Sequence, residues 1–193
     1  DCDMDSVEVL PGETRWGQQA AILLESPQLA QERWISWVAD SHRARPPREP
    51  MSGWLSWYWL GSNVSENNLM QVADFAAKSG GKLRPGVIQI DDGYQNPDGQ
   101  AGLNGKFPSG TQGLASKITA SGALPGLMTR LEVDNPEGLG RFLGNIRHAA
   151  ENGFRYFKIT DPGAQTDPAG KQTHIEKKRA FYQAIRQAAG EDC

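Results

Sequence analysis

The sequence is poor in cysteine, in long apolar runs and in clustered basic charge. Its only cysteines, Cys2 and Cys193, stand near the two ends, so neither a disulfide framework nor a cysteine zinc site is available. No stretch approaches the roughly 18 consecutive apolar residues of a membrane span, and the first residues do not read as a signal peptide. Lysine and arginine form no run interleaved with aromatics, which argues against nucleic-acid binding. With a net charge of −3, these absences predict a soluble protein, the cytoplasm favoured, that binds neither membrane nor nucleic acid.

Tryptophan, by contrast, is plentiful, with six in 193 residues. Residues 1–27 read as a strand, a Pro-Gly turn and a second strand. Residues 28–50 combine an amphipathic helix, marked by Leu29, Trp34 and Trp37 at helical spacing, with a linker rich in proline and arginine. This linker is the clearest boundary in the chain, and residues 51–193 are predicted to form a separate domain.

After the linker, a strand followed by a helix recurs four times. The predicted strands are residues 54–60 and the segments PGVIQIDDG, ALPGLMTRLEV and FRYFKIT. Alternating strands and helices predict parallel strands, and nearly continuous apolar strands are typical of a sheet covered on both faces. An open doubly wound sheet and a (β/α)8 barrel both fit, but no G-x-G-x-x-G follows the first strand, which disfavours a nucleotide-binding sheet. We therefore expect an α/β fold: the first four βα units of a TIM-type (β/α)8 barrel.

The ends of the predicted strands carry the residues with chemical potential. In a (β/α)8 barrel, the C-terminal ends of the strands converge on the active site. Here those ends carry Trp57, Tyr58, Asp91, Asp92, Met128, Arg130, Lys158, Thr160 and Asp161. Aromatic rings stack on the C–H faces of sugars and carboxylates accept hydrogen bonds from hydroxyls, so the set favours a carbohydrate site. No third acidic residue clusters with the pair, so we expect neither a metal ion nor a cofactor.

Structural roles are open for the same residues. Asp91 and Asp92, followed by glycine, are also typical of a turn that caps a helix. Lys158 is also compatible with a surface lysine whose stem lies along the protein. Trp54, on the first strand, is as compatible with plain core as with a site.

Several motifs in order carry a resemblance to a known family. GWLSWYW, VIQIDDGYQ, NGKFPSGTQGLASKITASGALPGLM and YFKITD resemble the catalytic barrel of glycoside hydrolase family 36. This is the α-galactosidase and raffinose-synthase-like group, in clan D of the retaining α-glycosidases. The resemblance runs from Glu8 to the end of the sequence. It implies that residues 1–27 are the remnant of the β-sandwich that precedes the barrel in that family.

The resemblance also implies roles for individual residues. Asp91 and Asp92 would hold the hydroxyls of a terminal galactose-like unit in the −1 subsite. Trp54 and Trp57 would wall that subsite. Lys158 would lie beside the nucleophile, hydrogen-bond a sugar hydroxyl and keep the carboxylate ionised.

The sequence departs from the family pattern at three positions. Tyr94 replaces a tryptophan and keeps an aromatic ring, whereas Met128 replaces a tryptophan and removes a stacking surface. The family motif K-x-D reads Lys158-Ile159-Thr160 here, so the nucleophile's position carries a threonine. Asp161 is the tentative nucleophile, but side chains alternate along a strand, so it points away from Lys158 unless the strand end re-aims it.

A retaining glycosidase needs two carboxyl groups about 5 to 5.5 Å apart. The family's acid/base aspartate lies on a strand well beyond the fourth, and this sequence stops where a fifth strand would begin, so we expect no turnover by this chain alone. Two hypotheses remain: an α-galactosidase-like hydrolase that uses Asp161, and a non-catalytic carbohydrate-binding homologue whose nucleophile position is lost to Thr160. The expected partner is a galactoside-type oligosaccharide, together with a missing barrel half or a second copy of the chain.

Overall fold

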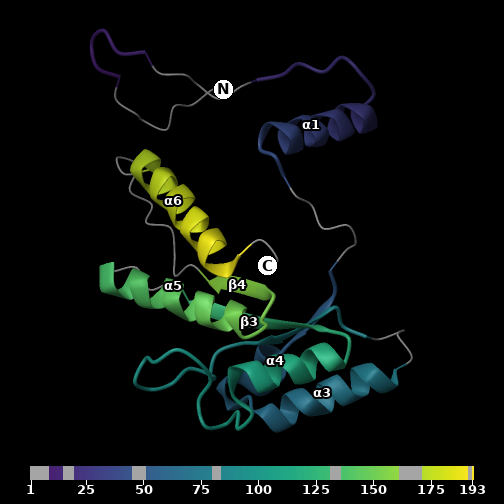
Figure 1. The fold of residues 1–193 in the computed structure, drawn as a ribbon. Coiled ribbons are helices and arrows are strands. Elements are labelled where there is room, and N and C mark those ends of the chain that lie inside the picture. The colour runs from purple at the N-terminus through teal and green to yellow at the C-terminus, as the bar shows by residue number, and fades with distance from the viewer. Residues whose placement is uncertain are drawn as a thin grey trace. The chain divides into compact units, whose positions relative to one another are not determined.

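The structure is a computed structural model that describes residues 9–14, 20–44, 51–79, 84–130, 136–160, 171–190 and 193. The chain divides into two compact units, residues 1–50 with 167–172, and residues 51–166 with 173–193. Each unit is described by itself, and the ribbon of Figure 1 traces both.

In the described residues 9–14 and 20–44 of the first unit, α1 (Pro27–Ser41) is the helix that the spacing of its tryptophans predicts. Ser26 precedes the helix in an extended conformation, and Pro27 occupies the first helical turn, where its missing N–H costs nothing. None of the residues of α1 is buried. Trp34 and Trp37 therefore add nothing to a core within this unit.

A tight turn precedes α1, but the predicted strands do not form in the described residues. The backbone N–H of Glu13 donates to the carbonyl of Leu10 at 2.9 Å, and Gly12 takes the positive φ of 82° that such a turn requires. Residues 9–14 and 20–26 contain no strand. Two strands without further partners are only marginally stable in water. The assignment of residues 1–27 to the end of a β-sandwich remains a prediction.

The second unit is built on one parallel sheet whose strands follow their sequence order (Figure 1). The strands are β1 (Gly53–Leu55), β2 (Val87–Ile90), β3 (Leu124–Arg130) and β4 (Tyr156–Thr160). Between and after them come α2 (Trp57–Leu60), the 3-10 helix η1 (Gly61–Asn63), α3 (Glu66–Lys78), α4 (Gly110–Ala120), α5 (Pro136–Glu151) and α6 (Lys171–Ala189). The predicted α/β class with four parallel strands alternating with helices is confirmed.

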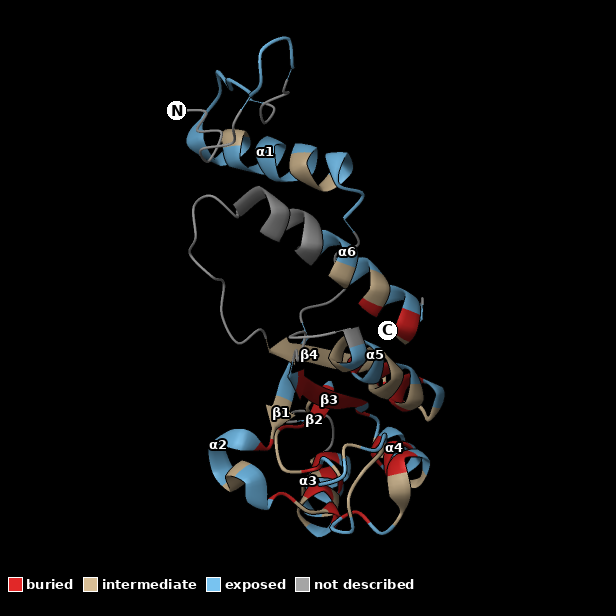
Figure 2. Ribbon diagram, turned by 90° about the vertical axis from the view of Figure 1, so that its left-hand side faces the viewer, coloured by how far each residue is buried: buried red, intermediate tan, exposed pale blue. Residues whose placement is uncertain are grey.

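The two faces of the sheet carry different side chains. One face packs on α3 and α4 in the main core, to which the strands contribute Trp54, Ile88, Ile90, Leu127 and Phe157. Figure 2 shows this burial in red on β3 and on parts of α3 and α4. The alternate positions, Gln89, Met128, Lys158 and Thr160, point to the opposite face, because successive side chains of a strand alternate. The polar side chains of Gln89, Lys158 and Thr160 thus lie on the face away from α3 and α4.

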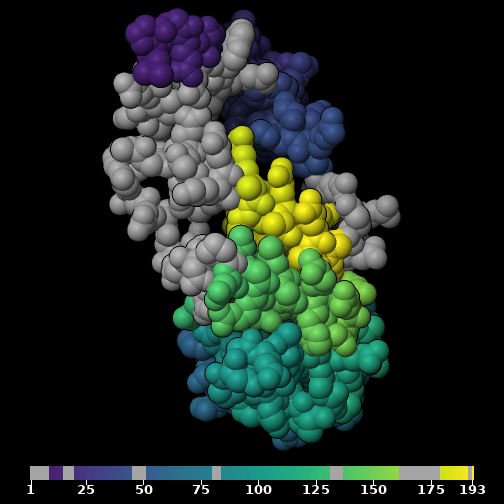
Figure 3. All heavy atoms as spheres, turned by 60° about the vertical axis from the view of Figure 1, so that its left-hand side comes forward, coloured from purple at the N-terminus to yellow at the C-terminus, as the bar shows by residue number. Residues whose placement is uncertain are grey.

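A second, smaller core joins α5 and α6. Phe142 and Ile146 of α5 pack with Ile185 and Ala188 of α6, and the rings of Phe142 and Phe181 lie 5.4 Å apart. The space-filling view shows the side chains of α6 (yellow) lying directly on those of α5 (green) (Figure 3). No helix in the described part of the chain is long and apolar enough to cross a membrane.

The first predicted strand is too long, and this is a correction. A strand was expected over residues 54–60, but β1 ends at Leu55 and residues 57–60 form the short helix α2. The reason is the length of the partner: the N–H of Ser56 still donates to the carbonyl of Gln89 at 3.1 Å, but β2 ends at Ile90. Beyond Ser56 no ladder partner remains, and local helix formation satisfies the backbone instead.

Candidate active site

The site is centred on Asp91, the first residue after β2. Its side chain lies on the same face of the sheet as Gln89, two residues earlier. The Gln89 side-chain amide donates to Asp91 Oδ2 at 2.7 Å, and the backbone N–H of Asp91 donates to Ser56 Oγ at 2.9 Å. Only 3% of Asp91 is exposed, and Ser56 is fully buried. Gln89 of β2 therefore holds the carboxylate of Asp91, and Ser56, the residue after β1, holds its backbone.

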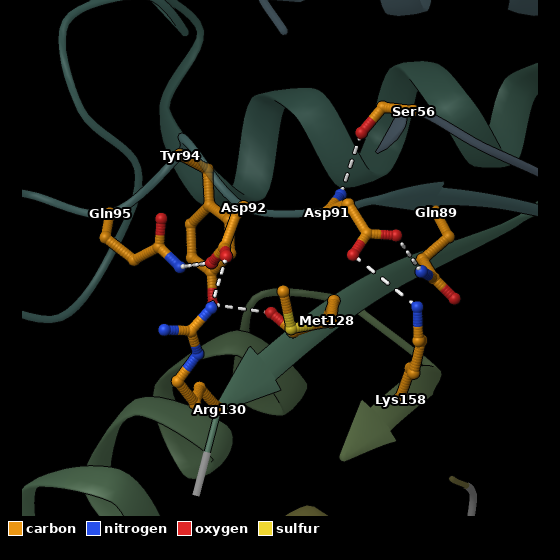
Figure 4. A network of polar contacts seen from close by, with 9 residues as sticks. All are labelled: Ser56, Gln89, Asp91, Asp92, Tyr94, Gln95, Met128, Arg130 and Lys158. Carbon is orange, nitrogen blue, oxygen red and sulfur yellow. Dashed lines mark hydrogen bonds and ion pairs between the residues drawn. The ribbon is translucent and has the colours of Figure 1, made fainter. Parts of the chain in front are cut away.

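Lys158 of β4 reaches the same carboxylate from two strands away. Its Nζ lies 3.6 Å from Asp91 Oδ1, an ion pair too long for a direct hydrogen bond. Met128 of β3 stands in register with Lys158, so the lysine stem crosses β3, as Figure 4 shows. Because neighbouring strands are about 4.8 Å apart, only a long side chain can make this contact.

Asp92 is engaged by a different cation. Arg130 Nη2, at the end of β3, donates to Asp92 Oδ2 at 2.9 Å, and Gln95 Nε2 donates to Asp92 Oδ1 at 2.9 Å (Figure 4). The Asp92 side chain is more exposed than that of Asp91, at 24% against 4%. Each acidic residue of the pair thus has its own cation, and the local charge is balanced.

A glycine makes the turn after the acidic pair possible. Gly93 has a φ of 106°, and a Cβ at this position would lie 2.3 Å from the carbonyl oxygen of Ser62. The side-chain amide of Asn104 donates to the carbonyls of Gly93 and Gln95, at 2.9 and 3.1 Å. The residues after Asp92 are therefore held against both the 3-10 helix and the following loop.

Tyr94 has a structural position. Its hydroxyl donates to the carbonyl of Met128 at 2.9 Å, and the residue is buried. Burial, followed by the nearby charges of Asp92 and Asp91, raises the pKa of Tyr94 above its usual range, so the phenol stays neutral. The ring links the loop after β2 to β3, and its largely covered surface is a poor platform for a sugar.

The two tryptophans expected to wall a sugar site, Trp54 and Trp57, occupy different positions in the structure. Trp54 stands in register with Ile88, on the helix-packed face, and its side chain contacts the main core, which is the structural role that the sequence left open. Trp57 lies on α2 and is 46% exposed, while its neighbours Tyr58 and Trp59 are 87% and 84% exposed. Of the pair, only Trp57 has a ring available at this end of the sheet.

Thr160, the last residue of β4, lies on the same face as Lys158. It stands in register with Arg130, as Lys158 does with Met128. The position at which the sequence resemblance implies a nucleophile therefore carries a neutral hydroxyl, on the face that carries Asp91. Asp161, the tentative nucleophile, lies outside the described residues.

Two contacts of the site were missed by sequence reasoning. Gln89 orients Asp91 and has a local signal, because it is the one polar residue in the otherwise apolar strand VIQI. Ser56 has no comparable signal, since its role depends on where β1 stops. Arg130 was recognised as a strand end, but its pairing with Asp92 could not be read from spacing.

The arrangement can bind a polyhydroxylated ligand. Two carboxylates have lone pairs left to accept hydroxyl protons, and Lys158 makes no hydrogen bond within the described part of the chain, so its ammonium can donate to a hydroxyl oxygen. In the same described ranges, no three acidic, histidine or cysteine residues lie together as metal ligands would.

The fold and the site together indicate the structural class of the protein. It is an α/β unit that forms the first part of a TIM-type barrel, and it carries charged side chains at the carboxyl ends of its strands. Among curated proteins, the chain is similar to probable alpha-galactosidase B of Talaromyces emersonii, with 29% identity over 130 residues, 61% of this chain and 29% of that protein. No protein-family model matches the chain. The chain is thus a homologue of α-galactosidases.

Solved structures give the same class of relative. The α-galactosidase of Thermus thermophilus in complex with p-nitrophenyl α-D-galactopyranoside superposes with a TM-score of 0.59 at 23% identity, covering 77% of this chain and 38% of that one. The Saccharomyces cerevisiae α-galactosidase with raffinose gives 0.57 at 25% identity, covering 72% and 32%. The chain therefore spans 29% to 38% of the length of these three relatives.

Proposed function

We propose that this chain is part of a family 36-type retaining α-galactosidase barrel, and that its site holds the terminal galactose unit in the −1 subsite. The observation that carries the proposal is the buried carboxylate of Asp91 facing Lys158 Nζ at 3.6 Å across the sheet. A sugar hydroxyl between these two groups donates to the carboxylate and accepts from the ammonium. Asp92 and the exposed ring of Trp57 complete the subsite.

The chemistry of such an enzyme needs more than these residues. In the double displacement, one carboxylate attacks the anomeric carbon and a second carboxyl group protonates the leaving oxygen, about 5 to 5.5 Å away. We assign the first role to Asp161 and expect the second group on a later βα unit of the barrel. This chain alone therefore binds galactosides without cleaving them.

The binding step is tested on the chain itself. Titration with galactose or raffinose, followed by calorimetry, should give saturable binding in the wild type. Asp91→Asn and Lys158→Met should each weaken it about tenfold, because each removes a charge-assisted hydrogen bond. Asp74→Asn, an exposed change on α3, is the matched control and should bind as the wild type does. Equal affinity in all four proteins would reject the assignment of the subsite.

The catalytic step is tested on a protein that joins this chain to the remaining barrel units. It should hydrolyse an aryl α-galactoside, and Asp161→Ala should abolish the activity. If hydrolysis survives that change, Asp161 is not the nucleophile.

A second function is favoured by the position of Thr160. A threonine on the face of Lys158 lacks the charge of a nucleophilic carboxylate and has no general base as partner among the described residues. A non-catalytic carbohydrate-binding homologue would show the binding above and no hydrolysis in the longer protein.

A further inference from the structure

A cavity of about 220 Å³ lies outside the sheet face that carries Asp91 and Lys158. It is enclosed by the loop of residues 94–103, by the end of β3 and by one side of α5. Leu127 and Thr129, which line it, belong to the helix-facing side of β3, opposite Lys158. Since a water molecule takes up about 30 Å³ in the liquid, the cavity holds on the order of seven waters, or one small organic molecule.

Two glycines of the loop, Gly99 and Gly102, line the cavity with a positive φ. Gly102 has a φ of 107°, and a Cβ there would lie 3.4 Å from Thr111 Oγ1 and 3.5 Å from His148 Nε2. Gly99 has a φ of 74°, and a Cβ there would lie 3.6 Å from Arg141 Nη1. At both positions the positive φ favours glycine, whereas a Cβ would make only ordinary van der Waals contact with these polar side chains.

Helix α5 contributes hydrogen-bond donors to one wall. Arg141, Asn145 and His148 are spaced at i, i+4 and i+7 and therefore share one side of the helix, and all three line the cavity. His148 Nε2 lies 3.4 Å from Thr111 Oγ1, which belongs to α4. A row of nitrogen donors and a hydroxyl thus face a single space.

The charge of the lining is positive. Arg141 has no ion pair or hydrogen bond within the described part of the chain, and the second guanidinium, Arg130, is paired with Asp92 at the mouth. No described lining residue is acidic. Asp98, in the same loop but outside the lining, accepts the backbone N–H of Gln100 at 3.1 Å. A free guanidinium in a concave, partly apolar space favours an anion with several acceptor oxygens.

We propose that this cavity binds the phosphoryl group of a small phosphorylated molecule, with Arg141 as the principal ligand and Asn145, His148 and Thr111 as additional donors. The rings of Tyr94 and Phe142 and the side chain of Leu103 line the rest of the space. They make this part of the lining apolar. The cavity is separate from the proposed galactose subsite, so the two proposals stand or fall independently.

The experiment is a calorimetric titration of the chain at constant ionic strength with three probes: inorganic phosphate, glucose 1-phosphate and neutral glucose. We expect saturable binding of phosphate or its ester, none of glucose, and binding about tenfold weaker in Arg141→Gln. The matched control is Arg147→Gln, which removes the same charge from the same helix but lies outside this cavity. It should bind as the wild type does.

Each result of the titration either identifies the ligand or overturns the proposal. Tighter binding of glucose 1-phosphate than of inorganic phosphate identifies a phosphorylated sugar as the ligand. Equal binding of the two identifies free phosphate as the ligand. No binding at millimolar probe, or the same loss in Arg147→Gln as in Arg141→Gln, overturns the proposal. Arg141 is exposed and makes no described contact, so both variants should keep the wild-type thermal midpoint without ligand.

Discussion

Ser56 provides a hydroxyl where the backbone N–H of Asp91 has no strand partner. The residue is fully buried, and its Oγ accepts that N–H at 2.9 Å. Its backbone also extends the β1–β2 ladder by one hydrogen bond to Gln89. Ser56 therefore makes the last hydrogen bond between β1 and β2 and holds the backbone of Asp91, the first residue of the acidic pair.

Ser56→Ala should lower the free energy of unfolding by about 1 to 3 kcal/mol, because it leaves the buried N–H of Asp91 without an acceptor. Urea titration followed by tryptophan fluorescence measures the change. Ser52→Ala is the control, since Ser52 is exposed and accepts the N–H of Gly86 in a long, weak hydrogen bond of 3.4 Å. The free energy of unfolding of this variant should stay within about 0.5 kcal/mol of the wild-type value. Equal effects at the two serines would contradict the role of Ser56.

Gly93→Ala should lower the free energy of unfolding for two reasons. Its φ of 106° strains any L-residue, and the new Cβ would lie 2.3 Å from the Ser62 carbonyl, so backbone must move. We expect a loss of about 1 to 3 kcal/mol and a weaker affinity for galactose, because Asp92 shifts with the turn. Gly105→Ala, with no neighbouring atom within 4 Å, should be neutral or slightly stabilising. A neutral Gly93→Ala variant would show that the turn adapts.

At the scale of elements, Glu66 in the first turn of α3 contacts both ends of α4, through its N-cap Ser109 and through Lys117 in its last turn. Its carboxylate accepts the backbone N–H of Ser109 at 2.8 Å and pairs with Lys117 Nζ at 2.7 Å. Burial alone would raise the pKa of Glu66, but hydrogen bonds from Lys117 and Ser109 outweigh it and hold the pKa below the ordinary 4.5. The ionised form therefore stabilises the folded state.

The sign of the pH dependence follows from this lowered pKa. The stabilisation is fully present above the ordinary pKa of 4.5 and is lost as the pH falls through the lower folded-state pKa. Urea midpoints measured from pH 6 downward should fall less steeply in Glu66→Gln than in the wild type. Glu151→Gln, near the end of α5, should keep the wild-type slope, and a wild-type slope in Glu66→Gln would contradict the assignment.

An element whose own residues show a clear apolar period is predictable from the sequence. An element whose length depends on a neighbouring strand is not. The period of Leu69, Ala73 and Ala76 predicts α3, and all three are buried. A strand is expected over residues 54–60, but the length of β1 depends on where its partner β2 ends, and residues 54–60 do not encode that end. In the site, the facing of Asp91 and Lys158 followed from parallel strands, whereas the pairing of Arg130 with Asp92 depends on rotamers that no spacing encodes.

At the scale of the whole second unit, each strand pairs only with its neighbours in the sequence. The main core already contains β1, β2, α3 and α4, with Leu69, Ile88, Leu114 and Ile118 fully buried. Every later strand adds to an edge that earlier residues have made.

Such an order permits vectorial assembly of these four strands on the ribosome, because β2, β3 and β4 each pair with a strand that has already been synthesised. Nascent chains arrested at successive lengths should gain protease resistance in steps, first when α4 has emerged and again after β4. A single step only on release of the finished polypeptide would show that the sheet forms all at once.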